Sequence, residues 1–270
     1  MKIGKLCVVI ISAIAALYYS TTGFTDTGET LLFNAEYQGK YSGMTIKSSR
    51  KLYLQENGQL RIESKIKNFM ASIEERSDFS LNNGILQPHY YHYKRKIMAF
   101  KADEKLSFDW EKNVAQYRRK DKPEKNRDHA IELGILDPVL YQLQLQRELY
   151  SGHDDFSFTF VKPSKVKTLL FKKTGDETLK VGDKTYPAIK VERINLDDEK
   201  QTRIWLIPEL NFQIAKIEHT EEDGNSYSIF LTGYTSHEKL LDVIYSKQPE
   251  TSSSNTDNSV TSKQAAPAEM

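Results

Sequence analysis

Apolar and polar residues alternate through most of the chain, and this pattern predicts β-strands. Side chains two positions apart point to the same face of a strand, so one row of each run faces a core and the other faces water. The clearest runs place on one face Leu60, Ile62 and Ile66, then Phe156, Phe158 and Phe160, and finally Tyr227, Ile229 and Leu231.

Short stretches rich in Asn, Asp and Gly separate these runs, at residues 56–58, 82–84, 173–176, 181–183 and 222–225. Asn and Gly supply the positive φ angles that tight hairpins require. We also interpret residues 197–199 as an exposed turn and Asp176, Glu177 and Asp183 as turn residues. The whole pattern predicts a mainly β fold, in which a strongly curved antiparallel sheet forms an open or half-closed barrel.

Residues 137–150 depart from the alternating pattern and predict the one α-helix of the fold. Asp137 is a favoured N-cap, Pro138 suits the first helical turn, and Gly152 suits a left-handed stop. One face carries Leu136, Val139, Leu140, Leu143 and Leu149. We expect this helix to cover the open mouth or the concave face of the sheet.

The two ends of the chain differ from the part between them. Lys2 and Lys5 precede an apolar run at residues 6–19, and small polar residues follow at 20–23, as in a signal peptide. As a helix the run covers roughly 21 Å, less than the ~30 Å of a bilayer core. We therefore predict a signal peptide at residues 1–23, with a retained anchor as the alternative. Once it is removed, no stable transmembrane span is expected, and the protein is periplasmic or secreted.

Residues 246–270 are almost entirely polar or small, and such a segment cannot bury enough apolar surface to order itself. We predict a disordered tail there, which leaves a single β-rich domain at residues 30–245. The only cysteine, Cys7, lies in the predicted signal peptide. The mature protein would then have no disulfide and no thiol nucleophile. The formal charge of the chain is +1, which argues against nucleic-acid binding.

The sequence contains no recognisable catalytic motif. His89 and His92 are three residues apart and would point to opposite faces of a strand, so they do not predict a metal site. Ser236 and Lys239 have the spacing of an activated serine, but the partner motifs of that chemistry are missing. There is neither a phosphate-binding glycine loop nor a dinucleotide fingerprint. We therefore predict no catalytic residue, no metal and no cofactor, and we favour a non-enzymatic role.

The strongest local charge feature is the basic tract from Arg118 to Arg127. Asp121 and Glu124 interrupt it, so a solvated loop is the simpler interpretation. The alternative is contact with phosphate groups of lipid headgroups or with another anionic glycan.

Four stretches, at residues 33–43, 88–95 with 108–110, 136–143 and 202–209, are similar to segments of an exported bacterial family known as domain of unknown function 3108. They include an aromatic and basic strand around Tyr91, a strand that ends in Phe-Asp-Trp at Trp110, and the start of the helix. The resemblance covers most of the chain. It implies an envelope-located β protein and brings no known reaction, substrate or catalytic residue.

These observations lead to three hypotheses about function. The first is a non-enzymatic envelope protein that binds a lipid or glycolipid in the curved sheet, whose 15 tyrosines and 12 phenylalanines could line a cavity. The second is a structural adaptor that binds another envelope protein through a strand edge. The third is a hydrolase of envelope polymers. For the first hypothesis we predict the ligand-binding residues Tyr91, Tyr93, Arg95, Trp110, Leu140, Leu143, Arg203 and Trp205.

Overall fold

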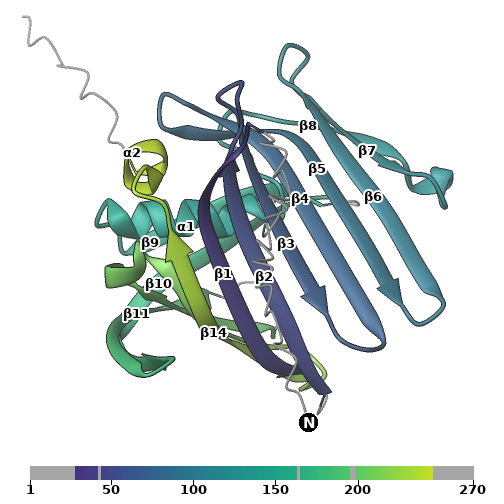
Figure 1. Ribbon diagram of the computed structural model, residues 1–270. Coiled ribbons are helices and arrows are strands. Elements are labelled where there is room, and N and C mark those ends of the chain that lie inside the picture. The colour runs from purple at the N-terminus through teal and green to yellow at the C-terminus, as the bar shows by residue number, and fades with distance from the viewer. Residues whose placement is uncertain (1–27, 42–43, 163–164, 195–198, 246–270) are drawn as a thin grey trace, which may run out of the picture.

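The computed structural model describes residues 28–41, 44–162, 165–194 and 199–245. Fourteen strands in these ranges form one sheet, in the order β8-β7-β6-β5-β4-β3-β2-β1-β14-β13-β12-β11-β10-β9 (Figure 1). Every neighbouring pair is antiparallel. The mainly β fold with a curved antiparallel sheet is confirmed. The predicted signal peptide (1–23), the predicted tail (246–270) and most of the predicted turn at 197–199 lie outside the described residues.

The sheet consists of two meanders, in which each strand pairs with the next along the chain. The first meander contains β1 (Thr30–Tyr41), β2 (Met44–Leu54), β3 (Leu60–Lys67), β4 (Ala71–Asn82), β5 (Ile85–Ile97), β6 (Phe100–Asp109), β7 (Val114–Arg119) and β8 (Arg127–Ala130). The second contains β9 (Asp155–Val161), β10 (Val166–Val181), β11 (Lys184–Ile194), β12 (Gln201–Ile207), β13 (Gln213–Thr220) and β14 (Ser226–Ser236). Two short 3-10 helices, η1 (Pro123–Lys125) and η2 (Pro208–Leu210), lie between strands.

The pairing of β1 with β14 joins the two meanders, and we call this strand pair the seam. It runs from Phe33 opposite Ser236 to Tyr41 opposite Tyr227. At Gly39 the strands approach so closely that a Cβ would lie 2.0 Å from the backbone oxygen of Ser228. Glycine is therefore required here by the close approach of the strands, since Gly39 lies inside a strand and not in a turn.

Helix α1 (Leu140–Tyr150) lies on the concave side of the sheet and contacts β5 and β9 (Figure 1). The helix begins at Leu140, three residues after the predicted start, and its N-cap position is Val139. The Asp137 carboxylate nevertheless accepts hydrogen bonds from the backbone N–H groups of Val139 (2.9 Å) and Leu140 (3.0 Å), and so caps the turn that leads into the helix. Gly152 follows the helix with φ +83°. A second, short helix that the sequence did not predict, α2 (Leu240–Ile244), follows β14.

One predicted turn is wrong. Residues 173–176 do not end a strand, because β10 continues through them to Val181. The register with β11 shifts between Lys173 and Gly175, where φ is +156°. A β-bulge thus accommodates the glycine and leaves the strand intact. Asp176 and Glu177, predicted to lie in a turn, instead pair with β11.

The alternation predicted from the sequence is confirmed in the core. Leu60 and Ile62 are buried, and the three phenylalanines of β9 (Phe156, Phe158 and Phe160) are at most 5% exposed. These side chains face the concave side, where α1 packs against the sheet. On the sheet edge formed by β9, the backbone of Leu136 bonds to Thr159 and Val161 and so covers part of the strand.

Candidate functional site

A cavity of about 430 Å³ opens within the concave face, between β1–β5, β13, β14 and α1, and we call it the inner pocket. Its apolar wall is made of seven isoleucines: Ile46, Ile66, Ile73, Ile97, Ile214, Ile217 and Ile229. The polar lining includes Arg50, Glu75 and Gln142. This volume is typical of sites for small ligands, and such sites combine mostly apolar walls with a few polar groups.

Strand register explains why these side chains share one wall. Ser48 of β2 lies opposite Ile66 of β3, which lies opposite Ile73 of β4. The next row inward holds Arg50, Ser64 and Glu75 in the same way. Because all these positions are two residues apart along their strands, they point to the same side of the sheet.

Arg50 is the most unusual residue of the inner pocket. It is only 4% exposed. Burial lowers the pKa of its guanidinium, whereas the charges of Glu75 and Asp137, among others, act to raise it. One terminal nitrogen donates to the backbone oxygen of Val139 (3.0 Å), the other donates to the Gln142 side chain, and Nε has no hydrogen-bond partner. Arg50 forms no ion pair with any residue that the structure describes. A buried cation is costly unless an anion compensates it, so this site is suited to a negatively charged group.

Glu75 separates the inner pocket from a second cavity. The Tyr91 hydroxyl donates to Glu75 Oε1 at 2.6 Å. Burial raises the pKa of the Glu75 carboxyl, while the bond from Tyr91 and the charge of Arg50 lower it. The second cavity, of about 310 Å³, is lined by Glu75 together with Tyr91, Tyr93 and Arg95. Glu75 therefore offers a hydrogen-bonding group to both spaces.

Asp137 lies behind Arg50 and is completely buried. The Ser77 hydroxyl donates to its Oδ2 at 2.5 Å. Burial raises the pKa of Asp137 to about 7, although the hydrogen bonds from Ser77, Val139 and Leu140 lower it. Because Asp137 also caps the turn that leads into α1, its protonation state affects the place where the helix meets the sheet.

We expect Asp137→Asn to change how stability depends on pH. An ordinary aspartate releases its proton near pH 3.8, whereas Asp137 holds it to about pH 7, so the folded state binds more protons between these values. Its contribution to the free energy of unfolding therefore falls as pH rises through this window. The asparagine variant should gain about 2 kcal/mol or more relative to wild type between pH 4.5 and 7.5, measured by urea denaturation.

The control for this prediction is Asp109→Asn. Asp109 is a surface carboxylate whose pKa is lowered by hydrogen bonds from Lys112, so it is already ionised over the same range. This variant should show no gain. A constant difference between wild type and Asp137→Asn across the range would show that Asp137 does not titrate there.

A third cavity, of about 330 Å³, adjoins the inner pocket and shares Gln142, Ile217 and Tyr227 with it. Its charged lining consists of four basic residues, Lys162, Lys167, Arg193 and Lys200, and one carboxylate, Glu221, which pairs with Lys200. Burial lowers the pKa of Lys162, and the positive charges of the other three lower it further. Because one carboxylate faces four cations, the excess of positive charge favours an anion in this space.

The structure brings together three of the predicted ligand-binding residues, since Tyr91, Tyr93 and Arg95 line the second cavity beside Glu75. Leu140 and Leu143 are at most 1% exposed and belong to the core. Neither lines the inner pocket, to which α1 contributes Gln142.

The other three predicted ligand-binding residues lie away from the inner pocket. Trp110 donates to the backbone oxygen of Pro88 (2.7 Å). On β12, Arg203 is half-buried, whereas Trp205 is only 2% exposed and belongs to the buried core. The indole of Trp205 donates to Glu177 at 2.9 Å.

Sequence reasoning missed Arg50, Glu75 and Gln142. A signal for Arg50 was present, because Ile46, Ser48, Arg50 and Leu52 alternate in phase and place Arg50 on the face of Leu52. Glu75 stands in a charged run, Glu74-Glu75-Arg76, in which no residue type marks the buried one.

Other candidate chemistry is distributed over the sheet. His89 Nε2 lies 2.9 Å from Ser80 Oγ, and His92 Nε2 lies 2.7 Å from Asp103, so the two rings have separate partners. Within the described ranges, no three His, Cys, Asp or Glu side chains are grouped to hold a metal ion. In the basic tract, Arg118 pairs with Asp128 and Arg119 with Glu104. None of the described helices is long and apolar enough to cross a membrane.

Comparison with known proteins gives a family match and distant structural similarities. Residues 36–232 match the family described as "Protein of unknown function (DUF3108)". The crystal structure of MucB in complex with MucA(peri) aligns at 9% identity, covering 81% of this chain and 92% of that chain, with a TM-score of 0.16. The MucA/MucB complex of Pseudomonas aeruginosa aligns at 10% identity, covering 80% and 93%, with a TM-score of 0.15. TM-scores this low do not establish a shared fold. No curated protein matches the chain.

Proposed function

We propose that this chain, which belongs to the DUF3108 family, is a non-enzymatic binding protein of the cell envelope that holds an anionic amphiphile in its inner pocket. The apolar chain of the ligand would lie against the isoleucine wall, and its anionic group would lie beside Arg50. The observation that carries the proposal is a buried arginine without an ion pair among the described residues, in a pocket that is otherwise mainly apolar.

The two ends of such a ligand would be stabilised by different interactions. Each buried CH₂ group contributes about 0.8 kcal/mol when it leaves water. An anion beside Arg50 could accept a hydrogen bond from its free Nε and would compensate a charge that burial disfavours. The basic residues of the third cavity would accommodate a larger headgroup with more than one negative charge. The signal peptide expected at residues 1–23 would bring the protein to the envelope, where lipids and glycolipids are available.

The geometry favours this proposal over the two alternatives. A structural adaptor with a packed interior does not require the inner pocket. A hydrolase requires two carboxylates that reach a substrate, and Glu75 and Asp137 are the nearest candidates. Asp137, however, is completely buried and lines none of the three cavities.

Native mass spectrometry of the protein purified gently from its own envelope tests the proposal directly. We expect a discrete extra mass that organic extraction removes, and the extract should contain an acyl chain and an anionic group. A single mass equal to that of the bare chain before extraction would contradict the proposal. An adduct that survives extraction would indicate a covalent intermediate and hence an enzyme.

A further inference from the structure

The turns that join β3 to β4 and β5 to β6 expose large apolar side chains at one end of the sheet. Phe69 is 86% exposed, Phe100 75% and Met98 64%. The two turns lie side by side at the lower end of the sheet in Figure 1, where the backbone N–H of Met98 donates to the oxygen of Met70 at 2.9 Å. We call these two turns the apolar tips. An exposed apolar cluster of this kind marks a binding surface.

A row of lysines crosses the outer face of the sheet directly behind the apolar tips. Each of its residues lies opposite the next on the neighbouring strand, in the order Lys47, Lys67, Ser72, Lys96 and Lys101, and we call this the lysine row. All four lysines are exposed. None forms an ion pair with any residue in the described part of the chain. Like charges directly opposite on neighbouring strands are destabilising, so the row weakens the fold unless an anion compensates it.

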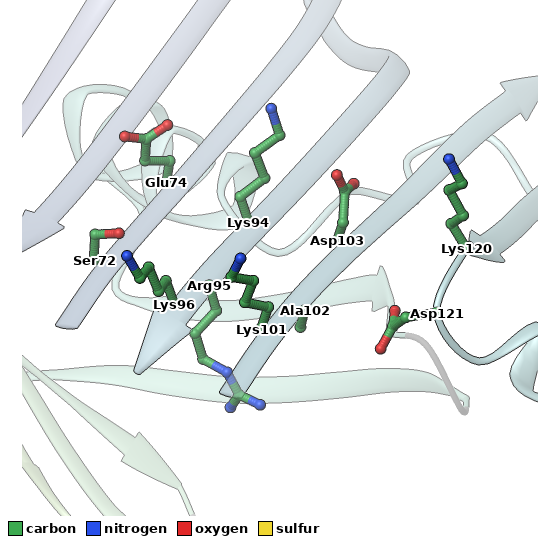
Figure 2. Close-up of a pocket in the computed structure, with 10 residues that line it drawn as sticks. All are labelled: Ser72, Glu74, Lys94, Arg95, Lys96, Lys101, Ala102, Asp103, Lys120 and Asp121. Carbon is green, nitrogen blue, oxygen red and sulfur yellow. The ribbon is translucent and has the colours of Figure 1, made fainter. Parts of the chain in front are cut away.

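Figure 2 shows part of this surface, which borders a cavity of about 610 Å³. Lys94, Lys96 and Lys101 point to one side of the strands, whereas Arg95 extends to the other side, toward the interior. Alternation along β5 and β6 therefore places the lysines on the outer face and leaves Arg95 for the concave face.

The apolar tips also adjoin the inner pocket. Asn68, Ala71 and Ile97 belong to these turns or flank them, and all three line the inner pocket. Ile97 is in addition 37% exposed. The pocket therefore approaches the surface at the same end of the sheet as the apolar tips.

We propose that this end of the sheet docks on an anionic lipid surface, with Phe69, Met98 and Phe100 inserted at the boundary of headgroups and acyl chains and with the lysine row on the phosphates. Apolar side chains flanked by lysines are the combination that binds an anionic membrane interface. Two protruding apolar tips fit a deformable lipid layer better than a rigid protein surface, although an acidic protein could match the lysines. This inference does not require that the inner pocket holds a ligand.

Vesicle sedimentation with the full chain tests the charge requirement. The vesicles contain phosphatidylglycerol and phosphatidylethanolamine, or phosphatidylcholine alone. We expect Lys96→Glu combined with Lys101→Glu to weaken binding to the anionic vesicles at least tenfold, since each lysine near such a surface contributes about fivefold. The matched control is Lys180→Glu with Lys184→Glu, two exposed lysines of the β10–β11 hairpin, and it should bind like wild type.

Residues 1–27 are present in every variant and include the apolar run at 6–19, which could bind vesicles by itself. A local probe therefore has to show that the apolar tips themselves contact the lipid. With lipids brominated on their acyl chains, Phe69→Trp should show additional quenching beyond the wild-type background from Trp110 and Trp205. Leu133→Trp is the control, because Leu133 is 67% exposed in the turn after β8, near Asn113 at the far end of β6 from Phe100. Position 133 should show no quenching beyond that background.

Three outcomes would overturn the inference. One is equal binding of wild type and the Lys96/Lys101 variant to anionic vesicles. Another is the absence of additional quenching at position 69. The third is binding of the lysine row to an acidic protein while the vesicles remain unbound. Arg50→Met should bind vesicles normally, so a failure of ligand retention and a failure of membrane docking can be told apart.

Discussion

Gly39→Ala is expected to lower the free energy of unfolding by about 3 kcal/mol, the upper end of what overpacking typically costs. The new Cβ would lie 2.0 Å from the Ser228 oxygen and 2.9 Å from the Ile229 Cα, so it would meet backbone that no rotamer change can move away. Relief requires the two strands to separate at the seam, where the meanders are joined.

The control for this prediction is Gly233→Ala, on the same pair of strands. There the nearest atom to a new Cβ is the Glu36 Cβ at 3.9 Å, an ordinary contact. Urea denaturation followed by circular dichroism should show a change within about 1 kcal/mol for this variant, since alanine also restricts the unfolded chain. Equal stabilities of the two variants would show that the strands at the seam leave room for a Cβ at position 39.

Arg50→Met should reduce retention of the ligand about 100-fold or more, the largest functional effect that we expect from one substitution. Truncating one partner of a buried, hydrogen-bonded charge pair costs about 2–5 kcal/mol of binding, which corresponds to this range. Methionine keeps a long side chain in the inner pocket, so the pocket volume changes little. The protein itself should lose little stability. The substitution leaves the oxygens of Gln142 and Val139 without the hydrogen bonds from Arg50, but it also removes the cost of burying an unpaired charge, and the two effects offset each other.

The measurement is the bound fraction by native mass spectrometry after identical purification. Arg76→Met serves as the control, because Arg76 lies beside Glu75 in sequence but pairs with Asp78 and does not line the inner pocket. It should retain ligand like wild type. If Arg50→Met also retains the ligand fully, the anionic group must lie elsewhere, with the basic residues around Lys162 as the next candidates.

Local patterns were sufficient to predict most of the fold. The period of two placed Ile229 and Tyr227 on the face that lines the inner pocket. Asp137 and Gly152 marked the ends of the helical region because capping depends on neighbours a few residues away. The bulge at Gly175 was missed because it depends on a distant segment. A glycine in a bulge and a glycine in a turn look alike in sequence, and only the pairing with β11 tells them apart.

The candidate site could not be predicted in the same way, because long-range contacts create it. Arg50 is buried by hydrogen bonds to Val139 and Gln142, which are 89 and 92 positions away in the chain. In the sequence it stands between Lys47 and Lys51, next to two serines, and its residue type does not mark it as buried. Alternation places Arg50 on the same face as Leu52, but only the placement of α1 on that face shows that the guanidinium is buried.

The seam also has a consequence for the order of events during synthesis. Glu36 pairs with Gly233, so β1, the first strand to be synthesised, cannot complete its pairing until β14, the last strand, has been made. Each meander can form from local hairpins as it emerges, whereas the junction needs both. Until then the edge of β1 is open to other chains, and a nascent chain stalled before β14 would be prone to aggregate or to be recognised by chaperones.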